Sequence, residues 1–334
     1  MDKTELFARL GPEIATVDQA MRHDLQDLAS KKLLPDTLLH VLEHALFNGG
    51  KRIRPLLCIL AARLCGHPGK EVYPLAIALE YLHVATLLHD DVIDNAETRR
   101  GRPSANKTFG LTPVILAGDF LHARSMFLVG TLGGRQCLEL ICDATEAMVA
   151  GEFLQLANAQ NFNQSEQDYF AVINGKTALF IGAVCETGGI FGGANAMQTE
   201  ALKTYGANLG KAFQMQDDLL DYLGDPAKTG KTVGNDFCEG KMTLPLLHTL
   251  SKASRSEYDF LLGLLKGMKN ERVAKLEEVR EIIRKNSGFQ YTRNLAEQLI
   301  NDAVASLSFF AAARDKPALE TLVGLARYVV TREK

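Results

Sequence analysis

The chain has 334 residues, of which 46% are hydrophobic and 23% are charged, a composition that fits a globular protein of one large domain or two ordinary ones. Its net charge of −3 provides no electrostatic case for nucleic-acid binding. The apolar stretches look too short or too broken by charges to span a membrane, and the acidic start lacks a signal-peptide core. We therefore expect a cytoplasmic protein without stable membrane insertion.

Helical periodicity runs along nearly the whole chain. Apolar residues recur at three- and four-residue spacing, as in Leu38, Leu42 and Leu46, whereas alternating strand-like runs are scarce. Breaks are expected at residues 66–70, 98–104, 131–136, 187–195 and 224–236, where glycine, proline and polar residues gather. The pattern predicts an all-α protein, and without a linker-like stretch we expect a single helical domain over residues 1–334.

Two of the expected helices are poor in surface charge. Residues 144–159 and 176–189 look apolar on more than one face. Such helices lie either at the centre of a large bundle or at a subunit interface. We expect a homodimer. The six cysteines are scattered without a CxxC pair, which favours neither a zinc site nor a disulfide framework.

A basic segment precedes one expected helix start. Gly49-Gly50-Lys51-Arg52-Ile53-Arg54-Pro55 places three cations there, with Pro55 suited to the first turn. Backbone N–H groups at a helix N-terminus bind anions, and neighbouring lysines and arginines add to that attraction. The segment is a candidate anion site.

The first acidic cluster lies in HDDVIDNAETRRGRP, residues 89–103. On a helix Asp90 and Asp94 share one face, whereas Asp91 points about 100° away and suits a supporting role. Stacked carboxylates destabilise a helix unless a cation sits between them, and hard oxygen ligands select a hard cation such as Mg²⁺. Arg99 and Arg100 follow directly.

The second cluster, FQMQDDLLDYLGDP at residues 213–226, repeats this arrangement with Asp217, Asp218 and Asp221. Each cluster ends an otherwise apolar helix. One such cluster alone is most often a solvated helix end, but two copies with cations nearby suit a metal-bridged diphosphate. Lys228, Lys231 and Lys241 follow the second cluster and supply such cations.

At these residues the sequence resembles the trans-isoprenyl diphosphate synthases, the polyprenyl synthetase family. The resemblance runs from about Leu38 to the C-terminus, and the first 35 residues, a helical segment, carry no motif. The matching fragments are GGKRIRP (49–55), LLHDDVIDNAETRRGRPS (87–104), GD (118–119), GE (151–152), GKTA (175–178), FQMQDDLLD (213–221), GKTVGND (230–236) and GK (240–241). The resemblance implies one helical bundle around a deep cavity.

The resemblance also implies a role for each motif residue. The acids would hold roughly three Mg²⁺ ions per site when substrate is bound: Asp90, Asp94 and Asp217 as ligands, with Asp91, Asp218 and Asp221 supporting. The allylic diphosphate would be held by Arg99, Lys176, Lys231 and Lys241, with Thr177 and Gln214 at its reactive end. Isopentenyl diphosphate would be held by Lys51, Arg54, His83 and Arg100.

The implied reaction is head-to-tail prenyl transfer. The allylic diphosphate ionises, isopentenyl diphosphate attacks the allylic cation, and a proton is lost, in a cavity that excludes water. Because Arg99, Lys176, Asp90, Asp94, Asp217 and Lys231 act on the departing diphosphate, they are the candidate catalytic residues.

Product length should depend on the helix that ends in the first cluster. Family members that stop at fifteen or twenty carbons have an aromatic residue four or five positions before the motif, where this chain has Ala85 and Thr86, or an insertion within it. The nearest aromatic residue is Tyr81. With about one isoprene unit per helical turn, we expect a long product of about thirty to forty-five carbons. Octaprenyl diphosphate for a quinone side chain is the central prediction, with a floor at Met126, Phe127 or Leu138.

Three alternatives stay open. The first is a synthase with a shorter product of fifteen to twenty carbons. The second is a class I terpene cyclase, which also ionises diphosphates with aspartate clusters but needs no isopentenyl site. The third is a non-catalytic partner of a heteromeric synthase, although such partners usually lack motif acids that this chain retains.

Overall fold

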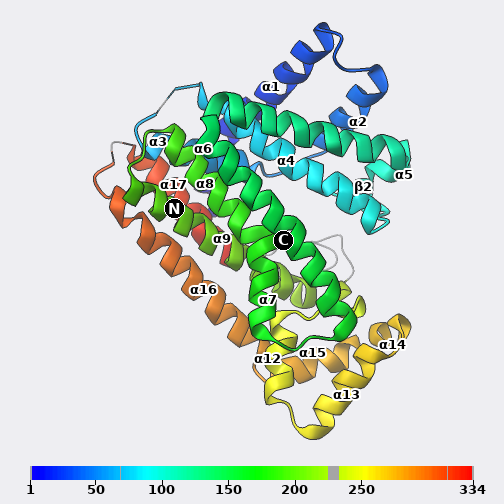
Figure 1. Ribbon diagram of the computed structural model, residues 1–334. Coiled ribbons are helices and arrows are strands. Elements are labelled where there is room, and N and C mark those ends of the chain that lie inside the picture. Colours follow the sequence, from blue (N-terminus) through cyan, green and yellow to red (C-terminus); the bar gives the residue numbers. More distant parts are fainter. Residues whose placement is uncertain (1, 68, 225–232, 314, 333–334) are drawn as a thin grey trace. The chain divides into compact units, whose positions relative to one another are not determined.

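The computed structural model describes residues 2–67, 69–224, 233–313 and 315–332, apart from the side chain of Gln160. Nearly all of these residues are helical (Figure 1), as the periodicity predicts. Two compact units divide the chain. The first comprises Met1–Cys142, Val184–Leu202 and Phe309–Gly324, and the second comprises Asp143–Ala183, Lys203–Ser308 and Leu325–Lys334.

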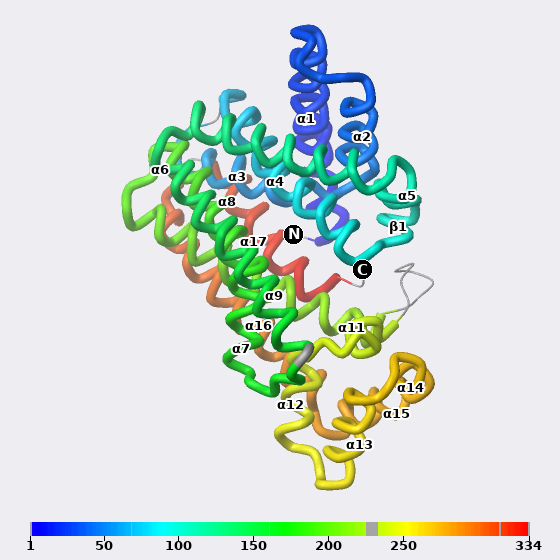
Figure 2. The backbone as a smooth tube through the Cα atoms, turned by 45° about the vertical axis from the view of Figure 1, so that its right-hand side comes forward, coloured from blue at the N-terminus to red at the C-terminus, as the bar shows by residue number. Residues whose placement is uncertain are grey.

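The first unit begins with α1 (Lys3–Ser30), α2 (Asp36–Phe47), α3 (Ile53–Leu64) and α4 (Val72–Ile93). Helix α3 is buried along nearly its whole length, because its sequence is apolar on every face. It packs against α4, and α1 and α2 cover α4 side by side (Figure 2). In α8 (Leu179–Phe191), Gly188 lies so close to α3 that an added Cβ would stand 2.3 Å from the carbonyl oxygen of Cys58.

A two-stranded hairpin is the exception to the all-α prediction in the described chain. Strands β1 (Thr98–Arg99) and β2 (Arg102–Pro103) pair antiparallel, where the sequence predicts only a break. The turn residues Arg100 and Gly101 have φ values of 55° and 76°, which matches the right-handed twist of a tight hairpin. Helices α5 (Ala105–Phe109) and α6 (Leu111–Asn161) follow, and α6 is broken at Gly134, within the predicted break at 131–136.

The second unit contains the C-terminal part of α6 and then α7 (Glu166–Ile173), which leads into the short π-helical turn η1 (Asn174–Ala178). Helix α9 (Ala196–Leu223) enters the unit at Lys203 and carries the second aspartate cluster. The later elements of this unit are α11 (Asn235–Cys238), α12 (Leu244–Lys252), α13 (Arg255–Lys266), α14 (Lys269–Ala274), α15 (Leu276–Lys285) and α16 (Gly288–Ser306). The last two elements, η2 (Leu307–Phe310) and α17 (Lys316–Thr331), each have residues in both units, because Phe309–Gly324 belongs to the first.

The core of the second unit joins α9 to α12, α13, α15 and α16. Tyr222, Phe237 and Phe289 are its aromatic members, with leucines and isoleucines around them. Helix α12 packs against α7, α15 and α16, and α13 to α15 lie next to it (Figure 2). This core fixes the C-terminal end of α9, from which the cluster acids project.

The expectation that every apolar stretch is too short or too broken to span a membrane is wrong. By length and composition, Val72–Ile93, Leu111–Ala159 and Glu166–Phe191 would suffice. These stretches contain too few charged residues to exclude a membrane span by composition. In α4 the apolar character serves the core, since 72% of its most apolar window is buried, but the corresponding share in α6 is 39%.

Candidate active site

The first aspartate cluster ends α4. Asp94 is the C-cap residue that follows the last helical residue, Ile93, and Asn95 comes next with a φ of 48°, a left-handed conformation that commonly terminates helices. Asp94 is exposed and Asp90 is partly exposed. The C-terminal end of a helix carries partial negative charge, so carboxylates there are stabilised by a cation. The cluster has the position and the accessibility of a cation site.

Asp91 has the supporting position that the spacing predicts. Its side chain is 3% exposed, and it accepts a hydrogen bond from Nε of Arg99 at 2.8 Å and a second from the same guanidinium. The amide of Asn106 binds the Asp91 carbonyl at 2.9 Å. The hairpin thus ties Arg99 to Asp91, a contact that the sequence does not predict, while the diphosphate contact expected of Arg99 stays a prediction.

Arg54, His83 and Arg100, which were predicted to share the isopentenyl site, lie within electrostatic range of one another. Burial, and after it the charges of Arg54 and Arg100, lowers the pKa of His83 well below 6.5. Burial also lowers the pKa of Arg54 to about 10. A neutral histidine among arginines marks a region of positive potential, which suits an anion. Lys51 is exposed on the same segment.

Arg52 differs from its basic neighbours, because it is not available to a ligand. It is 2% exposed, and its guanidinium binds Asp18 at 2.8 Å and Glu80 at 2.9 Å. A third hydrogen bond goes to the carbonyl of Leu46. The sequence counts Arg52 among the three cations of this candidate anion segment but assigns it no substrate, and in the structure Arg52 anchors the loop before α3.

The second aspartate cluster presents three different environments. Asp217 is 43% exposed and pairs with Arg332. Asp218 is buried, and its two oxygens accept hydrogen bonds from the hydroxyl of Tyr169 at 2.7 Å and from Gln214 at 3.4 Å. Asp221 accepts the backbone N–H groups of Asn235 and Asp236 at 3.2 and 3.1 Å.

The acids of this second cluster are crowded. Burial, and after it the charge of Asp236, raises the pKa of Asp218 to about 8 and that of Asp221 to about 7. Asp236 is the last residue of the GKTVGND fragment, and no role was assigned to it from the sequence. Carboxylates whose pKa is raised by burial and by a neighbouring acid are stabilised as anions by a bound cation.

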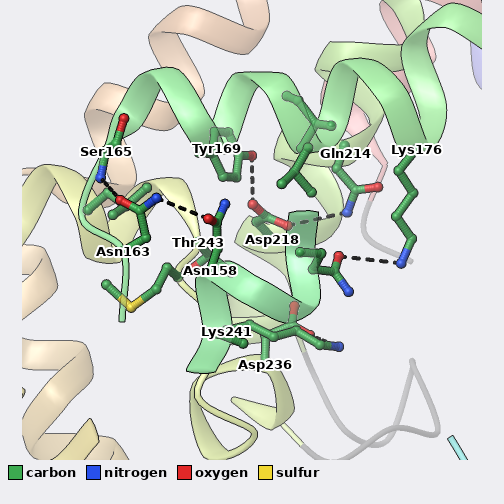
Figure 3. Close-up of a pocket in the computed structure, with 16 residues that line it drawn as sticks. Asn158, Asn163, Ser165, Tyr169, Lys176, Gln214, Asp218, Asp236, Lys241 and Thr243 are labelled. Carbon is green, nitrogen blue, oxygen red and sulfur yellow. Dashed lines mark hydrogen bonds and ion pairs between the residues drawn. The ribbon is translucent and has the colours of Figure 1, made fainter. Parts of the chain in front are cut away.

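A pocket with a cavity volume of about 130 Å³ opens beside this cluster in the second unit (Figure 3). Lys176, Gln214, Asp218 and Lys241 line it, so the structure brings these predicted residues together. Thr177 donates a hydrogen bond to Gln214 at 3.4 Å and thereby joins η1 to the same group. Lys231 lies outside the described residues.

The pocket cations have carboxylate partners. Lys176 binds Glu152 at 2.6 Å, and Lys241 binds Asp236 at 3.0 Å and Glu239 at 3.1 Å. Burial favours the neutral amine of Lys241, but Asp236 and Glu239 outweigh it and raise its pKa. Glu152 belongs to the GE fragment, which carried no assigned role, and Tyr169 gave no sequence signal at all.

The position of Lys176 depends on two glycines. An added Cβ on Gly151 would stand 2.8 Å from the backbone nitrogen of Lys176, and one on Gly175 would stand 2.8 Å from the carbonyl oxygen of Ala147. Because neither glycine has a side chain, η1 packs directly against α6. This contact places Lys176 beside Glu152.

Magnesium fits these residues in a particular way. Within the described ranges, no group of three or more histidine, cysteine or acidic residues is gathered as a metal cage. Mg²⁺ is usually held by one or two carboxylates while water and substrate phosphates complete its coordination. The repulsion among Asp218, Asp221 and Asp236 suits a cation that arrives with a diphosphate.

The predicted chain-length residues lie on α4. Tyr81 is fully buried, and its hydroxyl binds Asp24 at 3.0 Å. Ala85 is 2% exposed, and Thr86 donates a hydrogen bond to the carbonyl of His83 at 2.8 Å. On α6, Phe127 is 59% exposed. The roles in product length predicted for these residues, and for Met126 and Leu138, stay predictions.

Comparisons with known proteins converge on one family. The polyprenyl synthetase family model matches residues 35–283. The octaprenyl diphosphate synthase of Escherichia coli is 38% identical over 287 residues, which cover 86% of this chain and 87% of that protein. Relatives named for short-chain products match at lower identity.

Solved structures agree with the sequence comparison. A decaprenyl diphosphate synthase from Rhodobacter capsulatus aligns with a TM-score of 0.85 and 36% identity over 99% of both chains. A polyprenyl synthase from Caulobacter crescentus, complexed with calcium and isoprenyl diphosphate, aligns with a TM-score of 0.85 and 34% identity over 99% of this chain and 98% of that one.

Proposed function

Because this chain belongs to the polyprenyl synthetase family and is a prenyltransferase, we propose that it makes a long-chain all-trans polyprenyl diphosphate in a magnesium-dependent reaction. The substrates are isopentenyl diphosphate and an allylic diphosphate. The observation that carries the proposal is that both helix-terminal aspartate clusters have arginines or lysines beside them, Arg99 at the first and Lys176 and Lys241 at the second.

The allylic diphosphate is assigned to the acids of both clusters and to Arg99, Lys176 and Lys241, together with Lys231. Bound Mg²⁺ supplies positive charge that stabilises the departing diphosphate. Arg99, Lys176 and Lys241 add to that charge by binding phosphate oxygens, so the allylic C–O bond breaks with its electron pair on oxygen. Thr177 and Gln214 orient the reacting end.

Isopentenyl diphosphate is assigned to Lys51, Arg54, His83 and Arg100. Arg54 and Arg100 hold its diphosphate, and neutral His83 donates a hydrogen bond without adding charge. Its double bond attacks the allylic carbon, and the proton that is then lost goes to the released diphosphate. The apolar helices before each acidic cluster exclude water, which would otherwise quench the allylic cation.

Product length is proposed to be about thirty to forty-five carbons, centred on octaprenyl diphosphate, at about one isoprene unit per turn of α4. The small side chains Ala85 and Thr86 before the first cluster support a long product, and so do the octaprenyl and decaprenyl relatives. A product of fifteen to twenty carbons is the alternative, since short-chain relatives also match.

We propose further that the chain works as a cytoplasmic homodimer in which residues 1–334 form one catalytic domain. Apolar side chains along α6 support a subunit interface, because Leu116, Phe127, Val149 and Phe153 are each more than half exposed. Light scattering of the purified protein measures the oligomeric state. Replacement of Phe127 and Phe153 by glutamate should give a monomer, and a wild-type monomer would contradict the dimer.

The direct test is incubation of the purified chain alone with Mg²⁺, an allylic primer and labelled isopentenyl diphosphate. Chromatography of the dephosphorylated products gives their length. Long polyprenols that disappear when the metal is chelated are expected. Product formed without isopentenyl diphosphate would indicate a cyclase, and activity only with a second chain would indicate a partner subunit.

A further inference from the structure

Tyr169 contacts the second aspartate cluster from a different helix. It lies on α7 with 7% of its side chain exposed, and its hydroxyl donates a hydrogen bond to Oδ2 of Asp218 at 2.7 Å. Figure 3 shows this hydroxyl pointing at the carboxylate inside the pocket. A buried tyrosine needs a partner for its hydroxyl. Here the partner is an acid of the cluster proposed to act on the diphosphate.

Tyr169 is held rigidly before any ligand arrives. Helix α7 begins with Ser165, whose side chain accepts the backbone N–H of Asp168 at 3.1 Å and so caps the helix. The ring of Tyr169 packs edge-on against Phe170, with centroids 5.5 Å apart. A donor on a capped helix with a packed ring has few alternative rotamers, so its direction imposes an orientation on the acceptor.

Asp218 transmits that orientation along α9. Its other oxygen, Oδ1, accepts the amide of Gln214 at 3.4 Å, and the Gln214 carbonyl accepts the hydroxyl of Thr177. Asp217 is the preceding residue in the chain, and Asp221 lies about one helical turn after Asp218. Asp218 therefore connects Tyr169 with Gln214, Thr177 and the more accessible acids.

We propose that Tyr169 is a positioning residue: it orients Asp218, and through Asp218 the turn of α9 and the Gln214–Thr177 pair, for binding of a magnesium-complexed diphosphate. The inference rests on the proposed function of this cluster. In this role Tyr169 acts through its hydrogen bond to Asp218 and not by direct contact with the metal or the substrate. Groups that orient metal-binding carboxylates commonly contribute about tenfold or more to metal affinity.

The first test is Tyr169→Phe, which removes only the hydroxyl. Calorimetry with inorganic diphosphate at fixed Mg²⁺ should show about tenfold weaker binding. The Mg²⁺ concentration for half-maximal activity should rise similarly, while kcat at saturating Mg²⁺ stays near the wild-type value. A purely structural role predicts lower thermal stability with unchanged affinity, and that result would overturn the proposal.

Tyr291→Phe is the matched control. Tyr291 also donates to a carboxylate, Glu166 at 2.6 Å, in the same unit, but it does not line the pocket. Its loss should leave the calorimetric affinity within about twofold of wild type, since the bond it loses lies outside the pocket. An equal loss of affinity in both variants would show a general effect of removing tyrosine hydroxyls and would overturn the proposal.

A double-mutant cycle decides whether Tyr169 acts through Asp218. In an Asp218→Asn background, Tyr169→Phe should cause no further loss of affinity. A full additional loss would overturn the proposal while leaving the proposed reaction intact. If the wild-type protein itself fails to bind diphosphate with Mg²⁺, the proposed function fails, and this inference fails with it.

Discussion

Arg332 forms an ion pair with Asp217, although 115 positions of sequence separate them. The arginine is 7% exposed, lies over the ring of Phe213 at 4.0 Å and donates a hydrogen bond to the Phe213 carbonyl at 3.1 Å. A cation from the C-terminal end of the chain therefore already neutralises a partly exposed acid of the second cluster. Any metal that binds Asp217 competes with it.

Replacement of Arg332 by glutamine should distinguish its competition with a metal at Asp217 from its contribution to stability. The Mg²⁺ concentration for half-maximal activity should fall severalfold, because Asp217 loses its competing cation. The melting temperature should fall too, since a buried, hydrogen-bonded guanidinium is lost, at about 1–3 kcal/mol. Arg327→Gln removes an exposed arginine of α17, the helix that ends just before Arg332, and should change neither quantity. A higher Mg²⁺ requirement in Arg332→Gln would contradict the competition.

Glu80 should be among the residues most sensitive for stability. It is 2% exposed and binds the equally buried Arg52 at 2.9 Å, so Glu80→Ala leaves a buried guanidinium short of one partner. We expect a loss of about 3–5 kcal/mol in chemical denaturation. Asp259→Ala, which breaks an exposed pair with Arg255, should cost less than about 1 kcal/mol. Similar losses in the two variants would refute the assignment of Arg52 as an anchor.

Gly50→Ala should selectively weaken the binding of isopentenyl diphosphate. Gly50 has a φ of 136°, and a Cβ there would stand 2.8 Å from NH1 of Arg100 and 3.1 Å from NH1 of Arg52. We expect KM for isopentenyl diphosphate to rise severalfold while KM for the allylic primer stays within about twofold. The reason is that Arg100 is assigned only to the isopentenyl diphosphate site. Gly11→Ala, with no neighbour within 4 Å, is the control. Equal changes in both KM values would count against the assignment.

His83 should make the protein sensitive to acid. Its pKa in the folded state lies below 6.5, so below pH 6.5 the unfolded chain binds a proton that the folded protein does not. Stability is therefore lost as pH falls, by at most about 1.4 kcal/mol per pH unit from this residue. His83→Gln should flatten the decline of unfolding free energy between pH 6.5 and 5, and His40→Gln, at an exposed position, should not. Parallel profiles for wild type and His83→Gln would disprove the idea.

Ala85→Phe should shorten the product. A phenyl ring one to two turns before the first cluster would block a growing chain at about one isoprene unit per helical turn. Chromatography of the dephosphorylated products measures the length. Ala85→Ser changes the position without adding bulk and should keep the wild-type distribution. An active Ala85→Phe enzyme with that same distribution would show that the chain does not pass this residue.

Local patterns predicted the helical fold and some of the helix ends. The break at residues 131–136 follows from its glycines, and the direction of Asp91 away from the exposed face of the cluster follows from helical spacing. Both signals need only neighbours in sequence. The hairpin at Arg100 was missed as a structure, because its strands of two residues are too short to alternate visibly. Strands this short cannot be predicted from the alternation of apolar and polar residues.

Long-range partners could not be predicted in this way. Arg52 reads as one more cation of a basic segment until Asp18 and Glu80 enclose it. Tyr169 and Arg332 carry no motif, and they meet the second cluster from 49 and 115 positions away. Spacing places an acid on a helix face, but which side chain turns towards it depends on tertiary packing.

Both aspartate clusters lie at the pole of a helix where the backbone dipole is already negative, the end that proteins usually furnish with lysine or arginine. At both places the carboxylates are repelled by the negative end of the helix, and hydrophobic packing must outweigh that repulsion. Binding of magnesium and diphosphate would neutralise part of this negative charge at the ends of α4 and α9. The unfavourable electrostatic energy of holding these acids at the helix ends is relieved when the ligands bind, and it therefore contributes to their binding free energy.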